Sequence, residues 1–185
     1  MWNTRGLLGS TASSQVSRGP KLRYLKRLVE KNDVVCLQET HGKDEFLQAL
    51  QGFYPDFRLF GTFIHDNVNA GGSAILISEN LLSNQAVVTH EVTSQGRDHI
   101  IKVQSHEDSM TFVNVLLEPD MSLRHLRERL SRILVHWPRY PVGFGIIIGD
   151  FNICDPEEGR FNVSSPTFTE GDIGKTAVFR SVFPN

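Results

Sequence analysis

Apolar positions recur along the chain with two different periods. Where they recur every three or four residues, the pattern predicts an amphipathic helix, and short apolar runs predict strands. Helices are predicted at residues 20–29 and 44–51, and from an N-cap at Ser122 through His136. Strands are predicted at residues 33–38, 57–63, 72–78, 86–92, 99–103, 110–116 and 145–148.

Two parts of the chain carry no strong period. Residues 3–19 are rich in Gly, Ser and Thr and predict a loop that ends at Pro20, a residue suited to the first turn of a helix. Residues from 155 onward have mixed polarity and predict no element. The order of the other elements favours one α/β domain over residues 1–185, with helices covering the faces of a sheet.

The composition limits the classes of partner that the chain can bind. The 185 residues include 19 Lys plus Arg and 21 Asp plus Glu, which gives a formal charge of −2. This balance excludes a broad basic surface, so any contact with nucleic acid must come from a local site. No apolar run approaches the roughly 20 residues that span a bilayer, so no membrane partner is expected.

The two cysteines, Cys36 and Cys154, both lie beside apolar residues. They are too few for a disulfide framework or a cysteine zinc site, and they predict buried free thiols. No disulfide-linked partner is expected, and an intracellular, reducing compartment is favoured.

Two carboxylates stand where short apolar strands end. Glu39 follows the strand predicted at 33–38, and Asp150 follows the one predicted at 145–148. Residues at the carboxyl ends of strands build the sites of many α/β folds, and paired carboxylates near asparagines suit Mg²⁺, with Mn²⁺ as an alternative. Taken singly, each carboxylate is equally typical of a turn or a cap.

Four short sequence blocks, two of which contain these carboxylates, occur in order along the chain. Together they resemble the endonuclease/exonuclease/phosphatase superfamily, which includes DNase I and the abasic-site endonucleases. The first two blocks look most like the endonuclease domain of non-LTR (LINE-type) retrotransposons. The resemblance extends from Trp2 to at least Asn162. In chain order the blocks are Trp2-Asn3-Thr4-Arg5-Gly6-Leu7, Cys36-Leu37-Gln38-Glu39-Thr40-His41, Gly71-Gly72-Ser73-Ala74-Ile75 and Gly149-Asp150-Phe151-Asn152.

The resemblance implies a DNase I-like four-layer α/β/β/α sandwich and Mg²⁺-dependent phosphodiester hydrolysis. Asn3 would help to fix the metal and phosphate, and Glu39 would be the metal ligand. Asp150 would orient or deprotonate the attacking water, and Asn152 would donate hydrogen bonds to the phosphate. The implied partner is DNA, nicked in the nucleus to prime reverse transcription.

Two further residues are candidate substrate contacts. Arg97 stands at the entrance to a predicted strand, and His41 follows the proposed metal ligand closely. A loop ion pair for Arg97 and a turn position for His41 are the alternatives.

The chain departs from the family pattern at three places. The family's Ser/Thr-Asp-His block does not follow Asn152, and all seven histidines precede Gly149. Leu116 stands where family members usually have a tyrosine or histidine, and only Met1 precedes the Trp-Asn pair. The domain is therefore expected to be incomplete at both ends.

Such a chain is expected to be poorly soluble when isolated and to have little or no nuclease activity. Efficient Mg²⁺-dependent nicking that Glu39→Ala abolishes would contradict this expectation. Two alternatives stay open: a non-catalytic remnant, and a phosphatase or phosphodiesterase of the same superfamily that acts on lipid or nucleotide phosphates.

Four arginines recur along the predicted helix at 122–136, with only Glu128 opposing them. This pattern fits a surface that meets phosphates, but a solvated helix face is the default interpretation. The arginines are Arg124, Arg127, Arg129 and Arg132.

Overall fold

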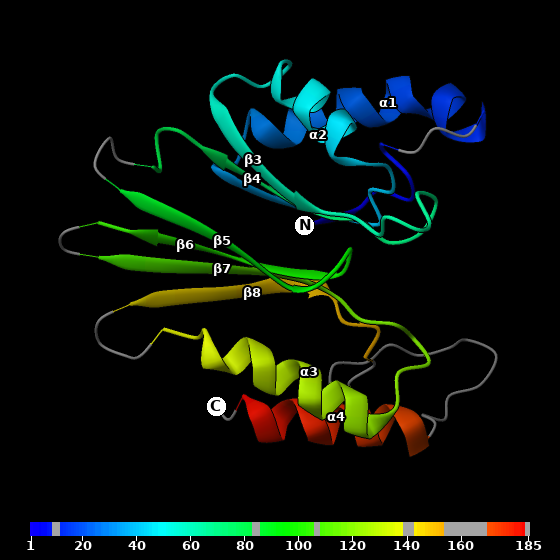
Figure 1. Cartoon of the computed structure of the whole chain (residues 1–185), viewed down its shortest axis with the longest axis vertical. Coiled ribbons are helices and arrows are strands. Elements are labelled where there is room, and N and C mark those ends of the chain that lie inside the picture. Colours follow the sequence, from blue (N-terminus) through cyan, green and yellow to red (C-terminus); the bar gives the residue numbers. More distant parts are fainter. Residues whose placement is uncertain (9–11, 83–85, 106–107, 139–142, 154–169, 184–185) are drawn as a thin grey trace. The chain divides into compact units, whose positions relative to one another are not determined.

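The chain forms two compact units. The computed structural model describes residues 1–8, 12–82, 86–105, 108–138, 143–153 and 170–183 (Figure 1). The sheet unit comprises Met1–Leu116 and Pro138–Asp150, and the helical unit comprises Leu117–Trp137 and Phe151–Asn185. That residues 1–185 act as a single domain stays a prediction.

The first sheet of the sheet unit has four strands in the order β1-β2-β4-β3. Strand β1 is parallel to β2, whereas β4 is antiparallel to both β2 and β3. Every residue of β4 is buried, as expected for a central strand that is covered on both faces. The strands are β1 (Trp2–Asn3), β2 (Val34–Gln38), β3 (Phe57–Thr62) and β4 (Ser73–Ser78).

Two helices, α1 (Ala12–Val29) and α2 (Asp44–Gln51), cover one face of this sheet (Figure 1). Their apolar positions pack with those of β2 and β4 in a buried cluster that excludes water from this side of the sheet. The cluster consists of Leu7, Leu8, Leu25, Val35, Leu37, Leu50, Phe63, Ala74 and Leu76.

The second sheet has the order β5-β6-β7-β8, with β7 and β8 parallel and the other pairs antiparallel. Its apolar face packs against the first sheet, because one buried cluster draws side chains from both sheets. The strands are β5 (Val87–Ser94), β6 (Asp98–Gln104), β7 (Ser109–Leu116) and β8 (Phe144–Asp150). The cluster consists of Cys36, Ile75, Ile77, Leu82, Ile101, Val103 and Phe112.

The helical unit pairs α3 (Leu123–Val135) with α4 (Glu170–Val182). Ser122 caps α3, because its side chain accepts a hydrogen bond from the His125 N–H at 3.3 Å, as the sequence predicted. The Arg129 guanidinium turns inward and donates to Glu118 at 2.5 Å. Aromatic ring contacts join Trp137 to Phe183, Phe151 to Phe179, and Phe179 to Phe183.

The predicted strands and the helices at 44–51 and 122–136 are confirmed to within a few residues, and so is the α/β class. The predicted loop at 3–19 is wrong over its second half, because α1 begins at Ala12 and contains Pro20 in its interior. Helix α4 was missed, since Gly174 and Thr176 interrupt its apolar period.

Cys36 is a buried free cysteine, as the sequence predicted, and burial raises the pKa of its thiol to about 12. Cys154 lies outside the described residues. Among the helices that the structure describes, none has the length and apolar character needed to cross a membrane.

A histidine pair joins neighbouring strands of the second sheet, with His90 of β5 exposed and His99 of β6 facing it. His99 is fully buried, and its Nδ1 lies 3.0 Å from Nε2 of His90. Burial lowers the pKa of His99 to about 3, and the neighbouring His90 contributes to this lowering. An unfolded histidine has a pKa of about 6.5, so between these pH values the unfolded chain binds more protons than the folded one.

We predict that the stabilisation from neutral His99 is complete above pH 6.5 and is lost progressively as the pH falls toward 3. Each pH unit in this window lowers the folding constant by up to about tenfold. Urea unfolding at neutral and mildly acidic pH measures the effect. His99→Gln should flatten the dependence, whereas exposed His125→Gln should not, and equal slopes in all three proteins would contradict the assignment.

Candidate active site

The strand ends that carry the sequence blocks meet at one edge of the sheet unit. Asn3 ends β1 and pairs in parallel register with Gln38, the last residue of β2, so that Glu39 comes directly after this pair. Ser73, the first residue of β4, pairs with Gln38 from the other side. In the second sheet, Asp150 ends β8 beside Leu116.

A hydrogen bond joins the two sheets at this edge. The Asn3 Nδ2 group donates to the Asp150 carboxylate at 3.1 Å, although the two residues lie 147 positions apart. The Asn3 side-chain carbonyl oxygen accepts the backbone N–H of Arg5 at 3.2 Å. Both ends of the Asn3 amide are therefore engaged, which fixes its orientation toward Asp150.

The backbone of Glu39 is held by the first block. Its carbonyl oxygen accepts the Gly6 N–H at 2.6 Å and the Thr4 hydroxyl at 3.0 Å. Glu39 itself has φ of 50°, in the left-handed region that non-glycine residues rarely adopt. The surrounding hydrogen bonds thus hold this half-buried residue in a strained backbone position.

Among the described residues, strained backbone of this kind, a positive φ at a non-glycine residue, occurs only in the sequence blocks. All non-glycine residues with positive φ in the described ranges lie there, and residues strained by about 1–3 kcal/mol each cluster at functional sites in proteins generally. These residues are Arg5 (φ 47°), Glu39 (φ 50°), His41 (φ 54°) and Asn152 (φ 45°).

The second and third blocks interlock through backbone contacts. Thr40 N–H donates to the Gly72 carbonyl at 3.0 Å, and His41 N–H donates to the Gly71 carbonyl at 2.9 Å. Gly72 has φ of +83°, and a Cβ at this position would lie 2.5 Å from the Thr40 hydroxyl oxygen. Only glycine fits this turn into β4.

A buried polar layer lies directly beneath these strand ends. The Gln38 side-chain amide donates to Asn114 Oδ1 at 2.5 Å. The Asn114 amide nitrogen lies 2.8 Å from Ser73 Oγ, 3.0 Å from the Leu37 carbonyl and 3.0 Å from the Ala74 carbonyl. Sequence reasoning missed Gln38 and Asn114, although polar residues inside otherwise apolar strands were a usable signal.

Leu116 is buried, and its backbone N–H donates at 3.2 Å to the carboxylate of Asp98, which is also fully buried. Its side chain has no hydrogen-bond donor to offer a phosphate. The neighbouring Arg97 lies in the turn before β6, where its N–H donates to the Ser94 carbonyl at 3.0 Å. This turn adjoins the blocks, because the Gly96 carbonyl accepts the Gly72 N–H at 2.8 Å.

His41 packs over the first block. A Cβ on Gly6 would lie 2.9 Å from its Nδ1. Burial lowers the pKa of the His41 imidazole, although the nearby Glu39 carboxylate acts in the opposite direction and Lys21 adds to the lowering. His41 therefore stands as a neutral, half-buried imidazole beside Glu39 at neutral pH.

The predicted residues fall into two groups. The sheet unit brings Asn3 and Asp150 into contact and holds Glu39 directly after the strand pair that Asn3 ends. Asn152 belongs to the helical unit, where its side-chain amide donates to the Leu117 carbonyl at 2.7 Å.

The donors at this edge are carboxylate and amide oxygens. Mg²⁺ and Mn²⁺ prefer such hard ligands, and Mg²⁺ often binds through one or two carboxylates together with water and substrate phosphates. Glu39 and Asp150 match that small protein contribution. Within the described ranges, no group of three or more His, Cys, Asp or Glu residues is placed to enclose a metal.

Two sheets packed face to face, with polar residues gathered at the strand ends, define the DNase I-like class of α/β proteins. The family model of the Endonuclease/Exonuclease/phosphatase family matches residues 2–177, so the chain belongs to this family. No curated protein sequence matches the chain significantly.

Solved structures agree with this fold. An abasic-site endonuclease from Leishmania major is 18% identical with a TM-score of 0.70, covering 98% of this chain and 64% of that one. The endonuclease domain of TRAS1, a telomere-specific non-LTR retrotransposon, is 13% identical with a TM-score of 0.56 over 85% and 63%. TDP2 from D. rerio, complexed with a single-strand DNA product, is 19% identical with a TM-score of 0.56 over 84% and 60%. The chain thus spans a little under two thirds of the length of these structures.

The strain at Glu39 generates a prediction about stability. Both Glu39→Gly and Glu39→Ala remove the carboxylate, but only glycine adopts φ of 50° without strain. We expect Glu39→Gly to be more stable than Glu39→Ala by about 0.5–1 kcal/mol in urea unfolding.

Glu45 provides the matched control because it is exposed in the first turn of α2. There the order should reverse, since glycine weakens a helix by about 1 kcal/mol relative to alanine. If the alanine variant is the more stable one at both positions, the conformation of Glu39 is not strained.

Proposed function

We propose that the chain hydrolyses phosphodiester bonds in DNA with the help of Mg²⁺, as the endonuclease domain of a retrotransposon-derived protein. The observation that carries this proposal is the contact between Asn3 and Asp150 beside Glu39. It joins two of the four block residues to which the family resemblance assigns catalytic or metal-binding roles, and Glu39 follows the strand residue that pairs with Asn3.

Each side chain has a separate task in the proposed reaction. Asp150 accepts a proton from the attacking water, and the hydrogen bond from Asn3 keeps the carboxylate correctly turned. Glu39 holds the divalent ion, which when bound supplies positive charge for the phosphoryl oxygens. Asn152 donates a hydrogen bond to the phosphate, because a side-chain amide carries two N–H donors.

Two lines of support favour DNA as the substrate. The structural neighbours include endonucleases, and another neighbour, TDP2, was solved with a single-strand DNA product. The first two sequence blocks look most like those of retrotransposon endonucleases, which act in the nucleus. A nuclear location is part of the proposal for the same reason.

One observation favours a second candidate, a remnant that binds metal without turnover. Leu116, at the position where the family usually has tyrosine or histidine, is buried and offers the phosphate no side-chain hydrogen bond. Loss of one preorganised donor typically lowers turnover by about 10²–10³-fold.

The test of the proposed function begins with metal binding. We predict that Mn²⁺, followed by water proton relaxation, binds the wild-type chain and binds Glu39→Gln at least about tenfold more weakly. Glu45→Gln is the control, because it removes the same charge from an exposed helix position. Equal binding by the wild type and both variants would overturn the assignment of Glu39.

Nicking of supercoiled plasmid in Mg²⁺ then separates the two candidates. Asp150→Asn should lower the rate by at least about 100-fold, because it removes the proton acceptor but keeps the shape of the side chain. Nicking that depends on Glu39 and Asp150 supports hydrolysis and overturns the expectation of little or no activity that the departures from the family pattern raise. Metal binding at Glu39 without any nicking contradicts hydrolysis and establishes the remnant.

A further inference from the structure

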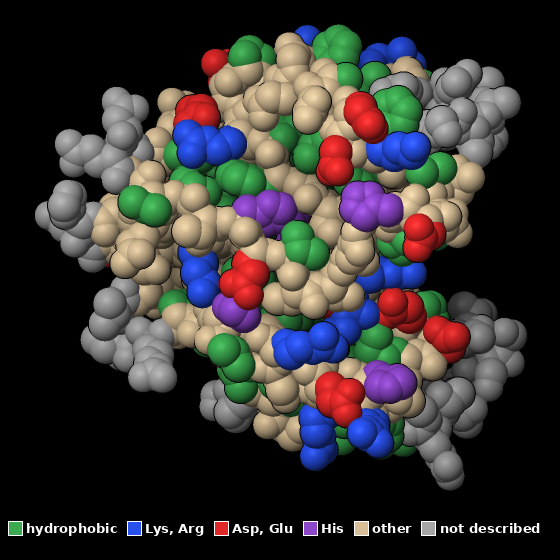
Figure 2. All heavy atoms as spheres, viewed as in Figure 1, with side chains coloured by type: hydrophobic (Ala, Val, Ile, Leu, Met, Phe, Trp, Pro, Cys, Tyr) green, Lys and Arg blue, Asp and Glu red, His purple; other side chains and the backbone are tan. Residues whose placement is uncertain are grey.

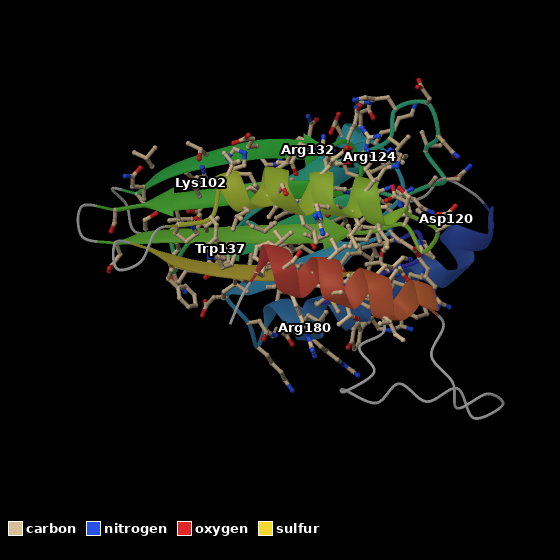
Figure 3. The ribbon with its side chains drawn as sticks, turned by 90° about the horizontal axis from the view of Figure 1, so that it is seen from below. Lys102, Asp120, Arg124, Arg132, Trp137 and Arg180 are labelled. Carbon is tan, nitrogen blue, oxygen red and sulfur yellow. The ribbon has the colours of Figure 1, made fainter. Side chains whose placement is uncertain are left out.

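The outer face of α3 carries positive charge that the candidate active site does not use. Leu126, Leu130 and Ile133 occupy the buried side of this helix. Three of its arginines are exposed, and the side chain of one, Arg124, is 86% exposed. Figure 2 shows basic side chains gathered over α3, and Figure 3 labels Arg124 toward one end of the helix and Arg132 toward the other. We call Arg124, Arg127 and Arg132 the α3 arginine face.

All three arginines stay exposed, although two of them contact Glu128. Arg124 forms an exposed ion pair with Glu128 at 2.9 Å, and Arg132 Nε donates to the Glu128 carbonyl at 3.4 Å. For the guanidinium group of Arg127, the described part of the chain offers no hydrogen-bond or ion-pair partner. The fourth arginine of α3, Arg129, is buried and bound to Glu118, so it serves the fold instead.

The charge of this helix differs from that of the chain. Helix α3 carries four arginines against one glutamate, whereas the chain as a whole has 19 basic and 21 acidic residues. A surface helix that only solvates its unit usually mixes both signs. An excess of one sign on one helix face is typical of a surface that attracts a polyanion.

We propose that the α3 arginine face binds the phosphate backbone of duplex DNA, as a contact surface on the helical unit additional to the candidate active site. The choice of DNA as the polyanion rests on the proposed function. Arg127 and Arg132 lie about 7.5 Å apart along the helix axis, because each residue rises about 1.5 Å. They also point about 140° apart around the helix, since each residue turns about 100°, and so they flank Arg124 on its two sides. Guanidinium groups separated in this way can contact different phosphates of the duplex backbone, where each strand rises about 3.4 Å per nucleotide.

A lipid surface fits this face less well than DNA does. Helices that bind membranes insert an apolar stripe and keep a basic stripe in water. In α3 the apolar stripe of Leu126, Leu130 and Ile133 is already buried inside the protein. The exposed apolar side chains of α3 stand at its two ends, Leu123 at the first residue and Leu134 and Val135 at the last two, so no continuous apolar stripe runs beside the arginines to enter lipid. The guanidinium groups suit phosphate directly.

The test measures the affinity of the full chain for a labelled duplex as a function of salt, in EDTA so that metal-dependent cleavage does not intervene. The double variant Arg127→Gln/Arg132→Gln should bind more weakly. The slope of log affinity against log salt should fall by about 1.8, or about 0.9 for each phosphate that is no longer neutralised. The control is Arg23→Gln/Arg27→Gln, which removes two exposed arginines from α1 and should leave the slope unchanged.

A second variant changes affinity in the opposite direction. Glu128→Gln removes the one acidic side chain from this face and releases Arg124, so it should tighten DNA binding by about two- to threefold. Glu79→Gln is the matched control, because Glu79 pairs with Arg58 at 3.0 Å on an exposed part of the sheet unit. Thermal melting confirms that each variant is folded.

Three results would overturn the inference: a wild-type slope in the α3 double variant, an equal fall of the slope in both double variants, or unchanged affinity in Glu128→Gln. Binding to anionic vesicles that depends on Arg127 and Arg132, with unchanged DNA affinity, would assign the face to lipid instead. Failure of the proposed function is a separate outcome, because it appears as absent nicking and leaves these slopes unaffected.

Discussion

The hydrogen bonds of Asn114 are the constraint on which the candidate active site depends. This one side chain of β7 reaches β2 and β4 of the facing sheet, through the Leu37 and Ala74 carbonyls and through Gln38. Apolar packing presses the two sheets together but does not fix their register, because it is not directional. A buried amide is directional, since leaving it unpaired costs about 1–3 kcal/mol.

Fixed register has chemical consequences at the strand ends. Gln38 immediately precedes Glu39, and Asn114 lies two residues before Leu116, which pairs with Asp150. The polar layer thus fixes the positions of Glu39 and Asp150 at the ends of their strands. The hydrogen bond from Asn3 to Asp150 joins the two sheets directly beyond this layer. The strained backbone of Glu39 persists because this network over-determines its position. The fold therefore tolerates a strained backbone at Glu39 in return for fixed positions of the carboxylate and amide oxygens at this edge.

Much of this arrangement could be predicted from local sequence. The strand ends at Glu39 and Asp150 and the cap at Ser122 each depend on a few neighbouring residues. Helix α4 could not be predicted in this way, because Gly174 and Thr176 interrupt the spacing of its apolar residues and its stability comes from packing on α3. The inward turn of Arg129 likewise depends on Glu118, which stands outside the helix that carries the arginine.

The measurement that tests the central claim most directly is anomalous diffraction from crystals of the chain grown with Mn²⁺. If the register set by Asn114 gathers Asn3, Glu39 and Asp150 into one hard-oxygen site, an anomalous peak should lie within coordination distance of the Glu39 carboxylate. It should lie at the edge where Asn3 meets Asp150, and it should vanish in Glu39→Gln. An intact fold with saturating Mn²⁺ and no peak at this edge would contradict the claim.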